Sequence, residues 1–105
     1  MRQVIFNIGL NNNPNDFYGM LEKLSKRIFS IQLARLGDGE YNGEIEPTLI
    51  AWSTTHATRQ QIVWNVALLC EQCKQEVIAV KINGEGVLVA PSGEVDGFNE
   101  KYFIV

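Results

Sequence analysis

The sequence predicts one α+β domain, residues 1–105, with a ferredoxin-like βαββαβ order and an extra C-terminal strand. The composition, 46% apolar and 20% charged, is that of an ordinary globular chain, and 105 residues suffice for one core. Segments with the strand period of two alternate with two segments of helical period. Their order is strand, helix, strand, strand, helix, strand, strand, and the first six match a split βαβ unit repeated twice.

This order predicts an antiparallel sheet with two helices on one face, so the other face is left to solvent or to a partner. A β-grasp or another α+β sandwich is the alternative topology.

Residues 4–10, VIFNIGL, are predicted to form the first strand. Their alternation places Asn7 on the face opposite Phe6. From Phe17 onward the period becomes helical, because apolar side chains recur at Phe17, Met20, Leu21, Leu24 and Ile28.

An asparagine triplet separates this strand from this helix. Asn13 precedes Pro14, a residue favoured in the first helical turn, and is suited to cap the helix. Asn11 and Asn12 tolerate the left-handed backbone of a tight turn. Capping needs one amide, so the surplus asparagines are candidates for binding a ligand.

The middle of the chain is predicted to contain two strands and the second helix. A second extended segment begins at Ile31, and residues 37–47, GDGEYNGEIEP, are typical of a hairpin connection, since turn formers and acids dominate them. Residues 48–52 are suited to a buried strand. The hydroxyl side chains that follow are candidate helix caps, at Ser53, Thr54, Thr55 and Thr58.

Thr58 and Gln61 together fit a capping box at the start of the second helix. One face of that helix is predicted to contain Ile62, Val66, Leu69, Cys70 and Cys73. Residues 76–82 and 87–90 then predict two strands joined by a turn at Asn83-Gly84-Glu85-Gly86. Residues 102–105, YFIV, are predicted to add a last short strand or to pack over the core.

The charge pattern excludes some classes of function. A net charge of −3 argues against non-specific nucleic-acid binding, which needs a basic surface. No apolar run is long enough for a membrane span, and the apolar N-terminal run is too short and too polar for a signal peptide. We therefore expect a cytoplasmic protein whose two cysteines are reduced.

The sequence predicts no metal site and no cofactor. Cys70 and Cys73 have redox or zinc spacing, but they fall late in a helix, and one histidine cannot complete a zinc site. We interpret them as core thiols. The acids after Gly37 imitate the start of a calcium loop, but Leu49 occupies the position of the bidentate glutamate.

Two stretches, IFNIGLNNNP and GEYNGEIEPTLIAW, resemble small uncharacterised α+β proteins of bacteriophages and of their bacterial hosts. The resemblance extends from residue 3 to about residue 90. It implies a small viral or mobile-element protein that binds a host component, and it implies no catalytic residue.

The first functional hypothesis is an interaction protein that forms a homodimer or binds another protein through the open sheet face or an edge strand. Candidate contact residues are Asn7, Tyr41 and Trp52. Its basis is the abundance of aromatic side chains together with the absence of any catalytic motif.

The alternative hypothesis is a protein that binds a small ligand: a nucleotide, a metabolite or an anion. Here the loops at residues 11–13 and 54–58 are expected to lie side by side, and the site residues are Asn11, Asn12, Asn13, Thr55 and His56. An enzyme would need His56 paired with Asp38 or Glu40, and nothing around His56 forms a catalytic constellation. The sequence therefore favours binding over catalysis.

Overall fold

The computed structural model describes residues 1–11, 14–41, 43–99 and 103–104, with the side chains of Pro14 and Tyr41 left out. The elements, in chain order, are β1 (Arg2–Gly9), a short 3-10 helix (Pro14–Asp16), α1 (Phe17–Ser25), β2 (Ser30–Tyr41), β3 (Glu44–Thr55), α2 (Arg59–Gln72), β4 (Ile78–Ile82), β5 (Glu85–Ala90) and β6 (Gly93–Val95).

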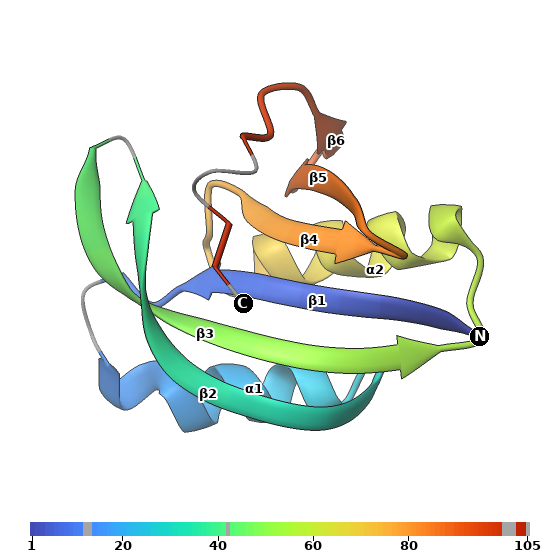
Figure 1. Cartoon of the computed structure of the whole chain (residues 1–105), viewed down its shortest axis with the longest axis horizontal. Coiled ribbons are helices and arrows are strands. Elements are labelled where there is room, and N and C mark those ends of the chain that lie inside the picture. Colours follow the sequence, from blue (N-terminus) through green and yellow to red (C-terminus); the bar gives the residue numbers. More distant parts are fainter. Residues whose placement is uncertain (12–13, 42, 100–102, 105) are drawn as a thin grey trace.

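The strands form one antiparallel sheet in the order β2-β3-β1-β4-β5-β6. The helices α1 and α2 lie behind this sheet in Figure 1, on the same face. The first four strands of this order are those of the ferredoxin-like fold, and β5 extends the sheet beyond β4, so the predicted fold class is confirmed. The short strand β6 was not predicted. Of the two alternatives predicted for residues 102–105, a last strand or packing over the core, the first does not hold for the described residues 103–104, which lie outside any strand and are half-buried.

The core lies between the sheet and the two helices. Val4, Phe6, Ile8 and Leu10 are buried on the helix side of β1, as the alternation predicts. The Phe6 and Phe29 rings meet edge to face with centroids 4.8 Å apart. The helices contribute buried side chains at Met20, Leu24, Ile62, Val66, Ala67, Leu69 and Cys70.

Helix α1 is shorter than predicted, because it ends at Ser25 and not at Ile28. The amide of Arg27 donates to the carbonyl of Leu24, which closes the last turn before the chain enters β2. Phe29 occupies the buried position instead, and Ile28 is 42% exposed.

The acidic stretch at residues 37–47 is not a long connection. The β2–β3 ladder continues to the pair Tyr41 and Glu44, so the described pairing reaches both sides of residue 42. Gly39 permits this because a Cβ there would collide with the Thr48 hydroxyl. Cross-strand packing has therefore overridden the weak strand propensity of glycine and acids.

The start of α2 confirms the predicted capping box. The Thr58 hydroxyl accepts a hydrogen bond from the Gln61 amide at 3.2 Å, and the Gln61 side chain accepts one from the Thr58 amide at 2.9 Å. Ser53, Thr54 and Thr55, also predicted as candidate caps, belong to β3.

Replacing Thr58 with alanine is expected to lower the free energy of unfolding by about 1 kcal/mol, because one amide of the first turn loses its acceptor. Chemical denaturation measures this loss. The variant Thr58→Ser keeps the hydroxyl and serves as the control, with a stability close to that of the natural chain. Equal losses in both variants would contradict the capping role.

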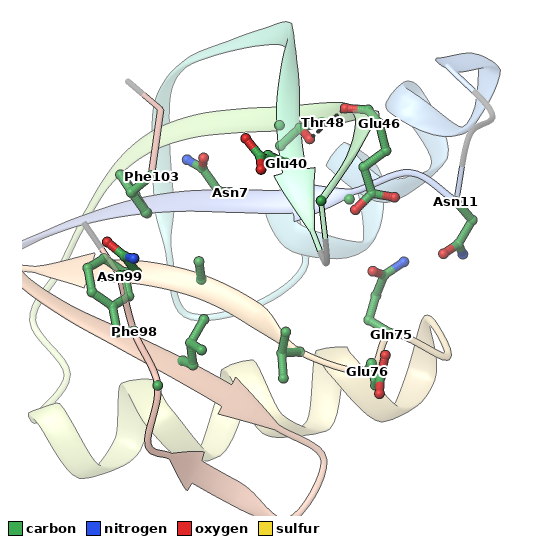
Figure 2. A pocket seen from close by; sticks show the side chains of 17 residues that line it. Asn7, Asn11, Glu40, Glu46, Thr48, Gln75, Glu76, Phe98, Asn99 and Phe103 are labelled. Carbon is green, nitrogen blue, oxygen red and sulfur yellow. Dashed lines mark hydrogen bonds between the residues drawn. The ribbon is translucent and has the colours of Figure 1, made fainter. Parts of the chain in front are cut away.

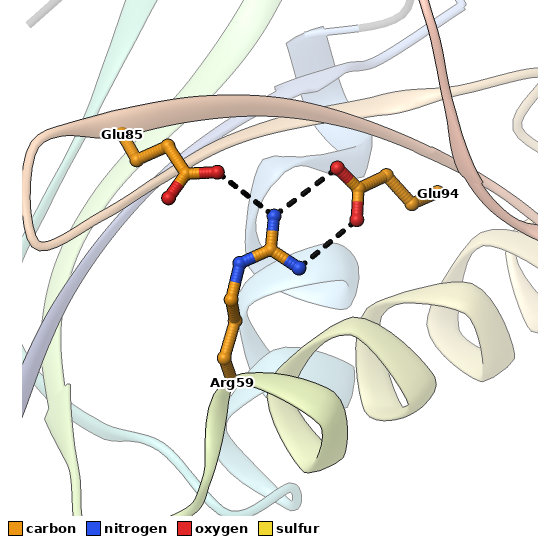
Figure 3. Close-up of polar contacts among 3 residues, drawn as sticks. All are labelled: Arg59, Glu85 and Glu94. Atoms are coloured by element: carbon orange, nitrogen blue, oxygen red, sulfur yellow. Dashed lines mark hydrogen bonds and ion pairs between the residues drawn. The ribbon is translucent and has the colours of Figure 1, made fainter.

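A second contact ties α2 to the far end of the sheet. Figure 3 shows the guanidinium of Arg59 between the carboxylates of Glu85 and Glu94. Arg59 donates to Glu94 at 3.0 and 3.1 Å and to Glu85 at 2.9 Å. The hydrogen bonds from Arg59 lower the pKa of Glu94, and the same bonds raise the pKa of Arg59. The short strand β6, which contains Glu94, is thereby fastened to α2.

We expect this cluster to make stability depend on pH. Because the pKa of Glu94 is lower in the folded than in the unfolded chain, its contribution is present at neutral pH and is lost as pH falls through the folded pKa. These side chains are partly exposed, so the contribution is about 1 kcal/mol or less, and salt screens it. Unfolding curves at neutral and acidic pH should show that Arg59→Met removes this part of the acid sensitivity, whereas Arg27→Met keeps it.

The sheet face opposite the helices is partly covered by the chain's own C-terminal segment, defined here as residues 96–99 and 103–104. The Asn7 side chain donates to the Ile104 carbonyl at 2.7 Å and accepts from the Ile104 amide at 3.0 Å. Lys81 lies 5.0 Å from the centre of the Phe103 ring. Ile50, on the same face of β3, is fully buried. The face that was predicted to be open therefore has a small second layer.

Within the described ranges, none of the helices has the length and apolar character needed to cross a membrane.

Candidate functional site

A pocket of about 520 Å³ lies on the sheet face opposite the helices, next to the C-terminal segment. Its walls are the tip of the β2–β3 hairpin, the end of β1, the start of β4 and the C-terminal segment, as Figure 2 shows. The lining residues are Asn7, Gly9, Asn11, Gly39, Glu40, Gly43, Glu46, Thr48, Gln75, Glu76, Val77, Ala79, Leu88, Gly97, Phe98, Asn99 and Phe103.

Glycine has no side chain, and at one position this leaves room for a side chain that lines the pocket. Gly9 lies in β1, and a Cβ on it would overlap the carboxylate of Glu46. Glycine in a strand weakens the strand, and it often marks a place where another group approaches the backbone closely. Here the approaching group is a glutamate side chain that faces the pocket.

Three glutamates line the pocket. Glu40 and Glu46 come from the two strands of the hairpin, and Glu76 comes from the segment before β4. Burial raises the pKa of Glu46, and the nearby charge of Glu44 raises it further. In the described part of the chain, no lysine and no arginine lines the pocket. Among the described residues, no group of three or more histidine, cysteine, aspartate or glutamate side chains is close enough to hold a metal ion.

A buried donor without an acceptor also borders the pocket. The amide nitrogen Nε2 of Gln75 is buried, and it donates to no group of the described chain. Leaving such a donor unpaired costs about 1–3 kcal/mol. The backbone around it is fixed, because the Gln75 amide donates to the Cys70 carbonyl at 2.9 Å and the Cys70 thiol donates to the Gln75 carbonyl at 3.1 Å. The side chain is thus held with its amide at the pocket wall (Figure 2).

The other end of the pocket is apolar. The rings of Phe98 and Phe103 are 5.8 Å apart and tilted by 45°. Val77, Ala79 and Leu88 continue this surface across β4 and β5. Figure 2 shows the rings at one end, and Glu46, Asn11 and Gln75 at the other. The pocket therefore offers a polar, acidic end and an apolar, aromatic end.

The structure contradicts the prediction that the loop after β1 and the loop after β3 lie side by side. Thr55 pairs with Arg2 at the start of β1, whereas Asn11 follows the end of that strand. Because β1 and β3 are antiparallel, their helix-bound loops leave at opposite ends of the sheet. Asn11 lines the pocket, but Asn12 and Asn13 lie outside the described residues.

Thr55 has a structural role, since its buried hydroxyl donates to the Ile28 carbonyl at 2.9 Å and accepts from the Ala57 amide at 3.1 Å. His56 is exposed at the same end of the sheet, away from the pocket. The prediction of a single ligand site that combines Thr55 and His56 with Asn11 is therefore wrong.

The predicted contact residues fall at three places. Asn7 lines the pocket and holds the C-terminal segment. Trp52 is half-buried on the same sheet face, with the guanidinium carbon of Arg35 5.8 Å from its ring centre. Tyr41 ends β2 beside the hairpin turn. None of these positions tests whether a partner binds, so that role stays a prediction.

The cysteines are placed as predicted. Cys70 is buried and Cys73 half-buried, and both are free thiols. Burial raises the pKa of Cys70 to about 11 and also raises that of Cys73. Both thiols are therefore protonated at neutral pH and are poor nucleophiles.

Sequence reasoning missed the residues that define the pocket, above all Gly9, Glu46 and Gln75. One signal was available: an isolated glycine within a strand pattern suggests a close backbone approach. The partner in that approach, Glu46, lies in a segment that looked like a loop, and Gln75 has no distinguishing motif.

Comparison with known proteins gives no family. No family model matches the sequence, and no curated protein is significantly similar to it. Among solved structures, a phage SAM lyase in complex with S-methyl-5'-thioadenosine is similar at 14% identity and a TM-score of 0.47, over 85% of this chain and 88% of that one. A phage SAM lyase in its apo state is similar at 13% identity and a TM-score of 0.46, over 93% of this chain and 92% of that one. Both are phage proteins, the class of source that the sequence resemblance implied, but at these values they indicate neither a family nor a function for this chain.

Proposed function

We propose that this chain binds a small organic molecule in the pocket beside its C-terminal segment. The observation that carries the proposal is the buried Gln75 amide nitrogen, which has no acceptor in the described chain and borders the pocket. A ligand oxygen or nitrogen would supply that acceptor. The volume of about 520 Å³ falls in the range typical of small-molecule sites, and the mixture of an apolar surface with a few polar groups is typical as well.

The pocket changes the kind of ligand expected. Anions and nucleotide phosphates are bound by cationic side chains or by helix N-termini. Among the residues that the structure describes, the lining instead includes three glutamates and neither lysine nor arginine. Of the ligand classes considered from the sequence, a metabolite without phosphate fits this lining best.

A thermal-shift screen against non-phosphorylated metabolites, followed by calorimetry on the hits, tests the proposal. A ligand at 100 times its dissociation constant adds about 2.7 kcal/mol to the stability, which is a shift of several degrees. Ala79→Leu fills the apolar end of the pocket and is expected to abolish binding. Ala90→Leu makes the same change at another half-buried strand position, the end of β5, which lies outside the pocket lining, and should leave binding unchanged. Failure of every compound, or equal binding by the Ala79→Leu variant, would retire the proposal.

A second function, self-association, is favoured by one observation. Strand β2 is 12 residues long and forms an edge of the sheet, and its Leu33 and Leu36 are 59% and 48% exposed. A long, apolar edge strand is a template for pairing with another chain. Antiparallel pairing of β2 with the β2 of a second copy would join the two sheets into one. Because the C-terminal segment lies on the sheet face, the edge is a better place for a homodimer contact than the face.

Light scattering tests this second function. The natural chain is expected to have the mass of a dimer at micromolar concentration, and the double variant Leu33→Lys, Leu36→Lys that of a monomer. Trp64→Lys changes an exposed side chain on α2, which contacts β4, β5 and β6 at the other end of the strand order, and should remain a dimer. A natural chain that stays monomeric up to millimolar concentration would exclude the edge contact.

A further inference from the structure

We propose that the ligand of this pocket is an organic cation with a flat or apolar body, its positive group held by Glu46 and its body packed against Phe98 and Phe103. The inference rests on the proposed binding function and names the chemical class of the ligand. It follows from the charges at one end of the pocket, the unpaired donor beside them and the rings at the other end.

The positive group is placed by the carboxylate of Glu46, for which the described residues supply no cation. Within the part of the chain that the structure describes, no lysine, arginine or histidine forms an ion pair with Glu40 or Glu46. Glu46 is half-buried and lies across the backbone of Gly9. Charges attract more strongly where water is partly excluded, so this carboxylate is a better partner for a cation than a fully exposed one.

Two cationic side chains near this sheet face, Lys81 and Arg35, lie over aromatic rings. Lys81 lies over the ring of Phe103, and Arg35 lies over Trp52. Neither residue lines the pocket. Within the described lining, a ligand anion would therefore meet carboxylates and neither lysine nor arginine, whereas a ligand cation would meet the half-buried carboxylate of Glu46.

The ionisation of Glu46 is expected to make the affinity for the ligand depend on pH. Among the described residues of the pocket lining and its surroundings, the charged groups near Glu46 are acidic: Glu44 on its own strand, Glu40 on β2 and Glu76 before β4. Strand β1 presents Asn7 and Gly9, and Asn11 follows it. Burial and Glu44 raise the pKa of Glu46 in the unbound chain. A cation prefers the ionised carboxylate, so its affinity should rise with pH through the pKa of Glu46 and then level off.

The rest of the ligand follows from the other walls. Nε2 of Gln75 needs an acceptor close to the positive group, such as a hydroxyl, carbonyl or ring nitrogen. The rings of Phe98 and Phe103 favour a planar or apolar body, because such a body packs on aromatic faces without losing hydrogen bonds to water.

Three indole compounds that differ in charge test the inference: tryptamine, tryptophol and indole-3-acetate, which are cationic, neutral and anionic at neutral pH. Calorimetry at constant ionic strength should find tryptamine bound most tightly, about tenfold more tightly than tryptophol, with indole-3-acetate weakest. Glu46→Gln should lower the affinity for tryptamine about tenfold and leave that for tryptophol unchanged. Glu44→Gln changes an exposed neighbour on the same strand and should have a much smaller effect.

The possible failures are distinguishable. If tryptophol or indole-3-acetate binds as tightly as tryptamine, the inference about charge is wrong and the proposed binding function stands. If Ca²⁺ or Mg²⁺ binds with the same dependence on Glu46 and none of the indoles binds, the inference of an organic body is wrong. If no probe and no ion binds, the proposed function fails together with the inference.

Discussion

Replacing Phe6 with alanine is expected to lower the free energy of unfolding by about 3–5 kcal/mol, the largest effect predicted for this chain. Phe6 is fully buried in the middle of β1, the strand that pairs with both β3 and β4. Its ring packs edge to face on Phe29, so the substitution removes both the buried area and the aromatic contact. A domain of this size has a total stability of about 5–15 kcal/mol, so the variant is close to unfolding.

Urea denaturation followed by circular dichroism measures this loss. Phe6→Leu keeps most of the volume and should lose much less stability. Ile5→Ala is the matched control on the opposite face of the same strand, where the side chain is only half-buried. A loss in Phe6→Ala no larger than that in Ile5→Ala would show that the core is not centred on β1.

Replacing Asn7 with alanine is expected to destabilise the chain by about 2 kcal/mol, because two hydrogen bonds to the backbone of Ile104 are lost. The substitution should also release the C-terminal segment and expose Ile50, which is buried on that face. The distinctive result is local: the Ile104 amide should lose its protection from hydrogen exchange, while amides of the core strands keep theirs.

The control for this variant is Asn7→Val. Valine has a higher strand propensity than asparagine or alanine, but it makes no hydrogen bond. If the Asn7 amide pair holds the C-terminal segment, both variants should lose protection at Ile104. Retained protection in Asn7→Val would assign the loss in Asn7→Ala to the strand and not to the segment.

Local patterns predicted the parts of the fold that depend on local physics. The alternation in β1 placed Phe6 and Asn7 on the correct faces, and the Thr58–Gln61 capping box fixed the start of α2. The patterns failed at residues 37–47, where glycines and acids favour a turn but pairing with a distant strand decides the outcome. They also placed the end of α1 too late, because the buried position belongs to Phe29 in the following segment.

The candidate site was harder to predict for a related reason. Gly9, Glu46 and Gln75 come from three separate segments, and no one of them belongs to a motif. Their proximity depends on the twist of the β2–β3 hairpin and on the path of the C-terminal segment, neither of which has a sequence signal. Asn11 was predicted as a ligand residue and Asn7 as a contact residue for a partner, and both line the pocket. Thr55 and His56 were grouped with the asparagines at residues 11–13 by assuming that two loops emerge together, and the antiparallel pairing of β1 with β3 excludes that.

The hydrogen bonds between Asn7 and Ile104 span 97 positions of the chain, and this separation has a consequence for the time at which the pocket can form. During synthesis, β1, the helices and most of the sheet leave the ribosome before Ile104 is made. Contacts of such long range carry a high entropic cost of loop closure and tend to form late in folding. Released chains that end just before residue 97 should therefore reach a protected sheet and core but bind no ligand. Binding competence would then report the synthesis and docking of the C-terminal segment, a step later than the acquisition of the fold.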